Sequence, residues 1–252
     1  MKHIMTIFLV ILLASCNIKK KPAEFNTKLF ADTLSLPKDS LGFYYPAKIF
    51  SDKPSLDSFV QNWYSSALYS FKEPLLSQNY IGHDVYRFLW LRSFHRPVVF
   101  TLQKMDSKIG LTTKMLDKQP MFHDDHFIAN DSIFSKGEKQ EYINAGYSIK
   151  KRRPHYLVYE KKADRTANII YNRKQYLSID DWNKFEQLLL KANFWKLPTN
   201  IDDGSTDGAQ WIIEGHLKRR YHVVNSHGPL TDGYGELGVF LIKLSGLDET
   251  IY

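Results

Sequence analysis

Cysteine is almost absent from this chain. Cys16 is the only cysteine among 252 residues, so no disulfide can form within the chain. In an exported protein a single leftover thiol is open to oxidation unless it has a dedicated role. The folded part must therefore be stabilised by its hydrophobic core, and the role of Cys16 has to be sought in the residues around it.

Long apolar runs are also missing. The most apolar stretch, Ile4 to Leu13, is broken by Thr6 and is far shorter than the roughly 20 residues that a helix needs to cross a bilayer. No later segment comes near that length. The sequence therefore predicts a chain without a membrane-spanning helix.

Recognisable catalytic motifs are missing as well. The chain has no Gly-x-Ser-x-Gly nucleophile turn, no phosphate-binding Walker loop and no paired metal-binding motif. Its composition is that of an ordinary globular protein, with 43% hydrophobic and 24% charged residues and a net charge of +7. The function must therefore be argued from the organisation of the chain.

The first sixteen residues have the layout of a secretory signal. A short cationic start, Met1 to His3, is followed by the apolar run and by two small residues before Cys16. Leu13-Ala14-Ser15-Cys16 resembles the lipobox of bacterial lipoproteins. The resemblance implies that residues 1–15 are removed and that Cys16 carries acyl chains, which anchor the protein in a membrane. The alternative is an ordinary secretory peptide that is cut nearby.

Residues 16–53 are predicted to form the lipid anchor and a tether, because they are polar and show no periodicity. Phe43, Tyr44 and Tyr45 are apolar enough to dock on the folded body. Asn17 stands where an aspartate would retain an enteric lipoprotein in the inner membrane, and Lys19 to Lys21 stand where surface-exported lipoproteins tend to carry acidic residues. By resemblance to these sorting rules we expect an outer-membrane anchor with the folded part facing the periplasm. The lysines can contact anionic headgroups. An exported protein is not expected to bind nucleic acid.

Residues 54–252 are predicted to form a single α+β domain, with helices packed on a mainly antiparallel sheet. Helical spacing predicts helices that begin at Ser55, at Ser178 and near Leu237. Ser178 and Asp181 resemble a capping box. The predicted buried stripe of the first helix comprises Leu56, Phe59, Val60, Trp63, Ala67 and Phe71.

Alternation of apolar residues predicts the strands. Residues 85–94 are apolar on both faces, which is typical of a central strand. The other predicted strands are a hairpin turning at 105–108, two strands at 156–160 and 167–172 separated by a polar turn, and a hairpin of 209–215 with 221–225. Residues 119–140 are ambiguous and resemble loop.

Several short motifs between residues 85 and 246 resemble a group of uncharacterised bacterial secreted proteins and lipoproteins. They are Tyr86 to His95, Phe194-Trp195 with Leu197-Pro198, Asp207-Gly208 with Trp211 and Glu214, and Tyr221-His222 with Val224. The likeness covers roughly residues 85–246. It implies that this part of the chain forms one folded unit, and it implies no particular activity.

The segment from Asp203 to Glu214 matches the EF-hand pattern of calcium ligands as a string. Its eighth and ninth positions are Gln210 and Trp211, where an aliphatic residue and an oxygen ligand are usual. Residues 211–215 also have the character of a strand instead of the required helix. We therefore expect an Asp-rich turn that leads into a strand, without bound metal.

Three further patterns are better explained by structural roles than by a cofactor, metal or catalytic site. Gly233, Gly235 and Gly238 match a dinucleotide fingerprint, but no βαβ unit can follow them, so the start of a helix is expected. His123 to His126 lacks a third metal ligand nearby. Ser226-His227 near Asp202 or Asp203 is adjacency in sequence and not the geometry of a triad. No cofactor is predicted.

Two hypotheses for the function follow. The first is a non-enzymatic envelope lipoprotein that binds an unknown protein or envelope ligand through aromatic and basic surface. The second is a hydrolase acting on an envelope polymer through Glu214 and His222. A pocket that gathers these two residues would favour the second hypothesis.

Overall fold

The structure, a computed structural model, describes residues 42–78, 80–201, 208–228 and 233–251. These residues form a seven-stranded sheet, in the order β7-β3-β2-β1-β9-β10-β8, and a separate three-stranded sheet in the order β4-β6-β5. All pairs are antiparallel except the short pair of β8 with β10. The predicted α+β class with a mainly antiparallel sheet is confirmed.

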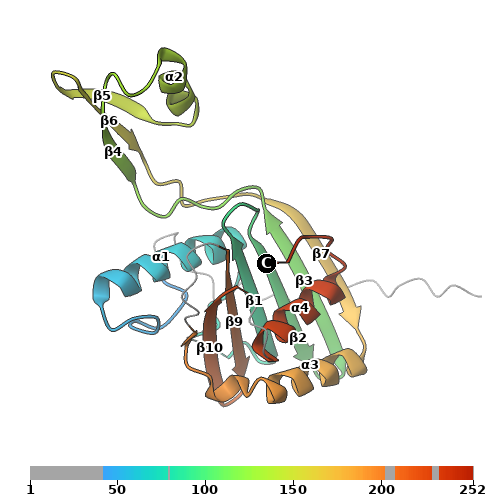
Figure 1. Ribbon diagram of the computed structural model, residues 1–252. Helices are drawn as coiled ribbons and strands as arrows, with labels where there is room; N and C mark the ends of the chain where they lie inside the picture. The colour runs from blue at the N-terminus through green and yellow to red at the C-terminus, as the bar shows by residue number, and fades with distance from the viewer. Residues whose placement is uncertain (1–41, 79, 202–207, 229–232, 252) are drawn as a thin grey trace, which may run out of the picture.

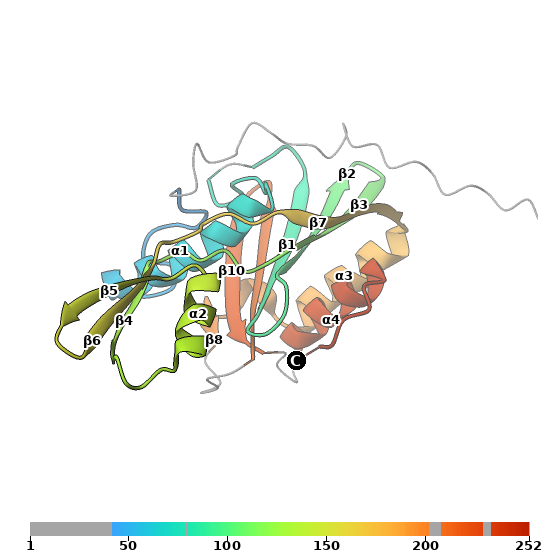
Figure 2. The same cartoon turned by 90° about the horizontal axis from the view of Figure 1, so that it is seen from above.

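The seven-stranded main sheet lies between two helical layers. Helix α1 covers one face, and helices α3 and α4 cover the other (Figures 1 and 2). In the part of the chain that the structure describes, no helix is long and apolar enough to cross a membrane. The elements of this body are α1 (Pro54–Ser70), β1 (Asp84–Arg92), β2 (Val98–Met105), β3 (Lys108–Leu116), β7 (Ile169–Leu177), α3 (Ile179–Lys191), η1 (Phe194–Lys196), β8 (Asn200–Ile201), β9 (Ala209–Leu217), β10 (Arg220–His227) and α4 (Gly233–Ser245).

Strand β1 is central because both of its faces are apolar. Phe88 and Trp90 pack in the core beneath α3 and α4, whereas Leu89 and Leu91 pack in the core beneath α1. The predicted hairpins β2–β3 and β9–β10 are also confirmed, as is the capping box at the start of α3. Phe94, predicted to continue β1, lies beyond its end and is exposed.

Helix α1 begins earlier than predicted and buries a different face. Lys53 is its N-cap and Pro54 occupies the first turn, so Ser55 is not the cap. Two residues of the predicted stripe, Leu56 and Phe59, are exposed, although Ala67 and Phe71 are buried. The buried face instead carries Asp57, Gln61, Tyr64, Ser65 and Leu68.

The polar residues of this face are buried because the segment before α1 supplies hydrogen-bond partners. Asp57 accepts from the backbone N–H groups of Lys48 and Phe50 at 2.9 and 3.0 Å. Gln61 donates to the carbonyl of Pro46 at 2.7 Å. Tyr44, Tyr45 and Phe50 are buried in the core beneath α1. The chain is therefore docked on the body from before residue 45.

A projecting arm is inserted between β3 and β7. It contains β4 (Asp125–Asn130), α2 (Lys136–Asn144), β5 (Ser148–Arg153) and β6 (Tyr156–Lys161), and it extends away from the main sheet (Figure 1). The prediction that residues 119–140 are loop is wrong, because they contain β4 and most of α2. The two strands predicted at 156–160 and 167–172 are present as β6 and β7, and they belong to different sheets.

The base of the arm rests on α1. Phe122 stacks on Trp63 and meets Phe59 edge-on, with ring centroids 6.1 and 4.9 Å apart. Arg165, in the connection from β6 to β7, donates to the side chain of Asn62 at 2.8 Å. These contacts join the arm to the body at its root, while its three strands lie beyond the root (Figures 1 and 2).

Candidate functional site

Glu214 and His222, the pair predicted for a hydrolase, are not brought together. Glu214 lies on β9 opposite Val223 of β10, whereas His222 lies opposite Gly215. Because successive side chains of a strand point to opposite faces, Glu214 lies on the α1 face and His222 on the face of α3 and α4. The two side chains are separated by the sheet itself, so no shared site is formed.

Glu214 is instead held by Arg87, its cross-strand neighbour on β1. The Nε and Nη2 atoms of Arg87 lie 2.7 and 2.5 Å from one carboxylate oxygen of Glu214. Tyr221 donates to the other oxygen at 3.0 Å. Burial raises the pKa of the Glu214 carboxyl, although Arg87 and Tyr221 favour its ionised form. Burial alone would lower the pKa of Arg87, but the carboxylates of Glu214 and Glu73 raise it, so the guanidinium stays charged.

A second buried carboxylate extends this ion network. Glu73 pairs with Lys114 at 2.6 Å, accepts from the hydroxyl of Thr101 at 2.9 Å and lies 3.7 Å from Arg87. Burial alone would raise the pKa of Glu73, but Lys114 and Arg87 hold it below its usual value. Arg87 and both carboxylates are almost completely buried beneath α1 and Tyr44. The network is closed to ligands and stabilises the packing of α1 on the sheet.

His222 belongs to an aromatic cluster on the opposite face. Its Nε2 atom lies 3.1 Å from the carbonyl of Leu197, and its ring meets Phe194 edge-on. Burial lowers the pKa of His222. The neutral ring therefore positions the short helix η1 against β10 and is not aimed at a solvent-accessible acid.

The calcium-like pattern is only partly within the described residues. Asp203, Ser205 and Asp207 fall outside them. Glu214, its twelfth position, lies in strand β9 with both carboxylate oxygens bonded to Arg87 and Tyr221. The expectation that this segment leads into a strand is confirmed from Ala209 onward. Within the described ranges no group of three or more metal-ligating side chains is found.

The glycine pattern at 233–238 is explained by packing. Helix α4 begins at Gly233, as predicted. A Cβ atom added at Gly238 would lie 2.2 Å from the indole ring of Trp211, and one at Gly233 would lie 2.9 Å from the backbone of Ala192. These glycines let α4 approach β9 and α3 closely.

The segment from His123 to His126 has structural partners. Asp124 accepts from Lys162 at 2.6 Å, Asp125 accepts from the hydroxyl of Tyr147, and His123 packs on Phe122. Ser226 is buried and donates to the carbonyl of Gly228 at 3.3 Å, so its hydroxyl is not presented to a substrate. Neither pattern forms a catalytic arrangement among the residues described here.

The arm presents an accessible surface that combines apolar, aromatic and basic side chains. One row of paired residues across β4, β6 and β5 faces α2, namely Phe127, Tyr159 and Ile149. Phe134, Tyr142 and Tyr147 complete a small aromatic core there. The next row of paired residues points to the opposite face and comprises Ile128, Val158 and Lys150. Figure 2 shows α2 on one side of the three strands only. The other side of this sheet is an open face.

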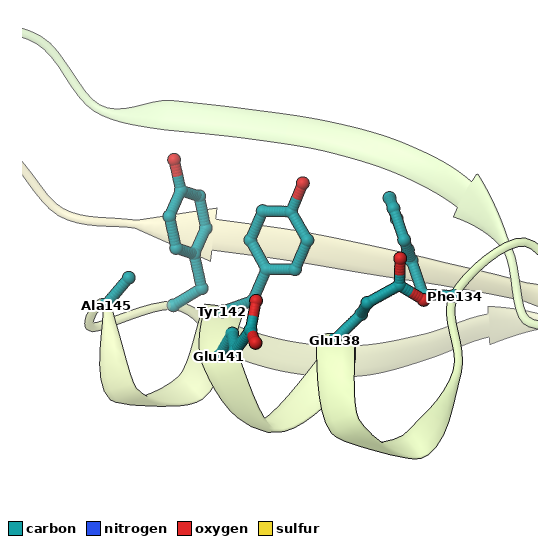
Figure 3. Close-up of a pocket in the computed structure, with 6 residues that line it drawn as sticks. Phe134, Glu138, Glu141, Tyr142 and Ala145 are labelled. Carbon is teal, nitrogen blue, oxygen red and sulfur yellow. The ribbon is translucent and has the colours of Figure 1, made fainter.

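A hollow of about 310 Å³ lies on the α2 side of the arm (Figure 3). The carboxylates of Glu138 and Glu141 lie beside the rings of Tyr142 and Phe134 at its mouth. Glu138 also closes the capping box of α2 by accepting from the N–H of Ser135 at 2.7 Å, and this hydrogen bond lowers its pKa. Aromatic rings beside carboxylates are suited to a cationic or apolar group.

A second hollow, of about 210 Å³, lies on the open face near the tip of the arm. It is lined by Ile128, Arg152, Arg153 and Tyr156. The pairing of β5 with β6 shifts between Lys151 and Arg153, so Arg152 is the extra residue of a β-bulge. A bulge changes the direction of the side chains that follow it. Both arginines thereby line the same hollow instead of alternating between faces.

Sequence reasoning missed the open face and its basic run, Lys150 to Arg153. The bulge and the strand pairing that create this face are tertiary features, although the run Lys-Lys-Arg-Arg was visible as an unusual concentration of charge. Comparisons with protein-family models, with curated proteins and with solved structures found no match.

Proposed function

We propose that this chain is a lipid-anchored envelope protein that acts by binding, and that the arm is its binding element. The anchor is the acyl chains predicted on Cys16, and residues up to the docked segment near Tyr44 form the tether. The proposed site is the outer membrane, with the body facing the periplasm. The partner is a protein or another envelope component.

The proposal rests on the exposed side chains of the open face of the arm. Ile128 and Tyr156 are 48% and 46% exposed there, beside two arginines. Tyrosine and arginine are enriched at interaction sites, and exposed apolar side chains gathered on one face are unusual unless something contacts them. Glu214 and His222, the pair considered for a hydrolase, do not form an accessible site, because Glu214 is buried and His222 lies on the other side of the sheet.

The position of the arm in the chain supports the same role. Binding residues are often placed on connections that a rigid scaffold holds out from its core. Here the connection between β3 and β7 has become a structure with its own sheet, helix and aromatic core. The body supplies the scaffold, and the two neighbouring strands of the main sheet hold the root.

A photoreactive amino acid placed at Tyr156 tests the proposal in intact cells. Irradiation should give covalent adducts with a protein or a lipid from this position. The matched control is Leu190, which is 77% exposed on α3 of the body, and it should give none. Adducts from position 190 together with none from position 156 would place the binding surface on the body and overturn the proposal.

A further inference from the structure

We propose that the open face of the arm lies against an anionic lipid surface, with Arg152 and Arg153 binding headgroup phosphates. This proposal deepens the proposed function and rests on it, since it assigns a partner class to the same face.

The two arginines are available to an external anion. Among the described residues neither guanidinium forms an ion pair, whereas the neighbouring Lys150 is paired with Glu160 at 2.6 Å. Arginine presents several N–H donors in a planar fork that matches the oxygens of a phosphate group. Because the bulge at Arg152 brings both forks to one hollow, a diester phosphate can contact the two together.

The other residues of the hollow suit the boundary between headgroups and acyl chains. Tyr156 combines an apolar ring with a polar tip, and Ile128 supplies an apolar side chain next to it. Tyrosine is enriched at membrane–water interfaces, and arginine stems can lie along apolar surface while their charged ends contact phosphate. A small inorganic anion would satisfy the arginines but would leave Ile128 and Tyr156 in water.

The two sides of the arm differ in a way that orients it. The hollow on the α2 side is bordered by the carboxylates of Glu138 and Glu141, which an anionic surface repels. The hollow on the open side is bordered by two guanidinium groups. An anionic bilayer therefore favours the orientation in which the open face is toward the lipid and α2 is away from it.

An acidic protein segment is the main competing partner, and the geometry of β5 argues against it. An extended peptide adds to an edge strand through a continuous row of backbone hydrogen bonds. Strand β5 is an edge strand, but the bulge between Lys151 and Arg153 interrupts its row of backbone groups, and its four consecutive basic residues are typical of an edge that is protected from pairing. The edge of β5 is therefore poorly suited to a peptide, whereas the face beside it gathers the exposed arginines.

Vesicle flotation tests the proposal with residues 17–252, which include every residue of the described fold and lack the acylated cysteine. The protein should float with vesicles that contain phosphatidylglycerol and remain unbound with phosphatidylcholine alone. The double variant Arg152→Ala, Arg153→Ala should partition about 30-fold more weakly, since each basic residue near an anionic surface contributes about fivefold. Ile128→Ser should weaken binding at high salt, where electrostatic attraction is screened.

The matched control is Lys218→Ala, Arg219→Ala, which removes the same charge from the exposed turn between β9 and β10. It should bind within about twofold of the parent protein, and circular dichroism melts should show that all variants are folded. Equal losses in the two double variants would show general attraction to a basic protein and would overturn the proposal. Displacement by millimolar inorganic phosphate would assign the hollow to a free anion, and would also overturn it.

The outcome is separable from that of the proposed function. Protein adducts from position 156, without flotation of the parent protein, would retain the arm as the binding element and replace the lipid by a protein partner. Absence of every adduct from position 156 would remove the proposed function itself.

Discussion

The backbone N–H of Asp117 donates to the carbonyl of Asn168 at 2.9 Å, and the carboxylate of Asp117 accepts from the backbone and side-chain N–H groups of Asn168 at 3.0 Å. These contacts continue the pairing of β3 with β7 beyond Leu116 and Ile169. The main sheet is therefore closed beneath the arm. The arm is an elaborated hairpin connection, and the hydrogen-bonded ladder of the body does not depend on it.

Removing the charge of Arg87 should strongly destabilise the body. Arg87→Met leaves Glu214 and Glu73 buried without their shared cation, which costs about 3–5 kcal/mol of unfolding free energy. Adding Glu214→Leu should recover a large part of that loss, because it removes the buried carboxylate that lost its partner. Urea unfolding of the single and double variants measures the coupling.

The exposed pair of Lys191 with Glu236 is the control for Arg87. Its side chains are 2.5 Å apart, but they are 59% and 43% exposed. Lys191→Met should therefore cost less than about 1 kcal/mol. A loss at Lys191 as large as that at Arg87 would contradict the role assigned to burial.

Glu73 should make the body sensitive to acid. Its pKa in the folded state lies below the ordinary value of 4.5, so the ionised carboxylate stabilises the fold at neutral pH. That contribution is fully present above the unfolded pKa and is lost as the pH falls through the folded pKa. Glu214 acts in the opposite direction, because its folded pKa is raised.

The Glu73→Gln variant isolates this contribution. It should be less stable than the parent at neutral pH and should lose less stability between about pH 6 and about pH 3. Melting temperatures across this range measure the difference, with Asp52→Asn as the exposed control. Parallel pH profiles for the parent and Glu73→Gln would show that Glu73 is not the group responsible.

Cys16 carries the predicted anchor, and its substitution should abolish it. Cys16→Ala removes the thiol on which the lipobox resemblance places the acyl chain. Metabolic labelling with palmitate should be lost, and the signal should remain uncut or be cut elsewhere. Labelling of the variant at the level of the parent protein would contradict the anchor, while leaving the description of the arm intact.

The body could be predicted from the sequence because its signals are local. Residues 85–94 show apolar residues on both faces, and Ser178 with Asp181 forms the expected capping box. The buried face of α1 could not be predicted in this way, since Gln61 and Ser65 are buried only because Pro46 and Tyr44, distant in sequence, supply hydrogen-bond partners.

The arm as a folded unit was not predicted, for a related reason, although its strand β6 was expected at 156–160. Strand β4 has little alternation, and its partner β6 follows only after α2 and β5, so the pairing that defines it is absent from the local sequence. The ion pair of Arg87 with Glu214 did leave a signal. Arg87 is the one charged residue between the two ends of β1, and Glu214 is the one carboxylate of β9. Such charges in apolar strands are seldom buried unless they are paired. The sequence does not show which two charges meet.

Excision of the arm tests the central claim most directly, namely that the arm provides binding and not the stability of the body. Residues 118–167 are replaced by Asn-Gly, so that Asp117 and Asn168 flank a two-residue hairpin turn. The shortened protein should melt cooperatively, within a few degrees of the parent, because the lost contacts with the body lie at the root of the arm. They are chiefly those of Gln119, Phe122, Arg165 and Ala167 with α1, and that of Gln119 with the carbonyl of Arg92. Its flotation with phosphatidylglycerol vesicles should fall at least to the level of the Arg152→Ala, Arg153→Ala variant. A protein that no longer folds, or one that folds and floats like the parent, would contradict the account.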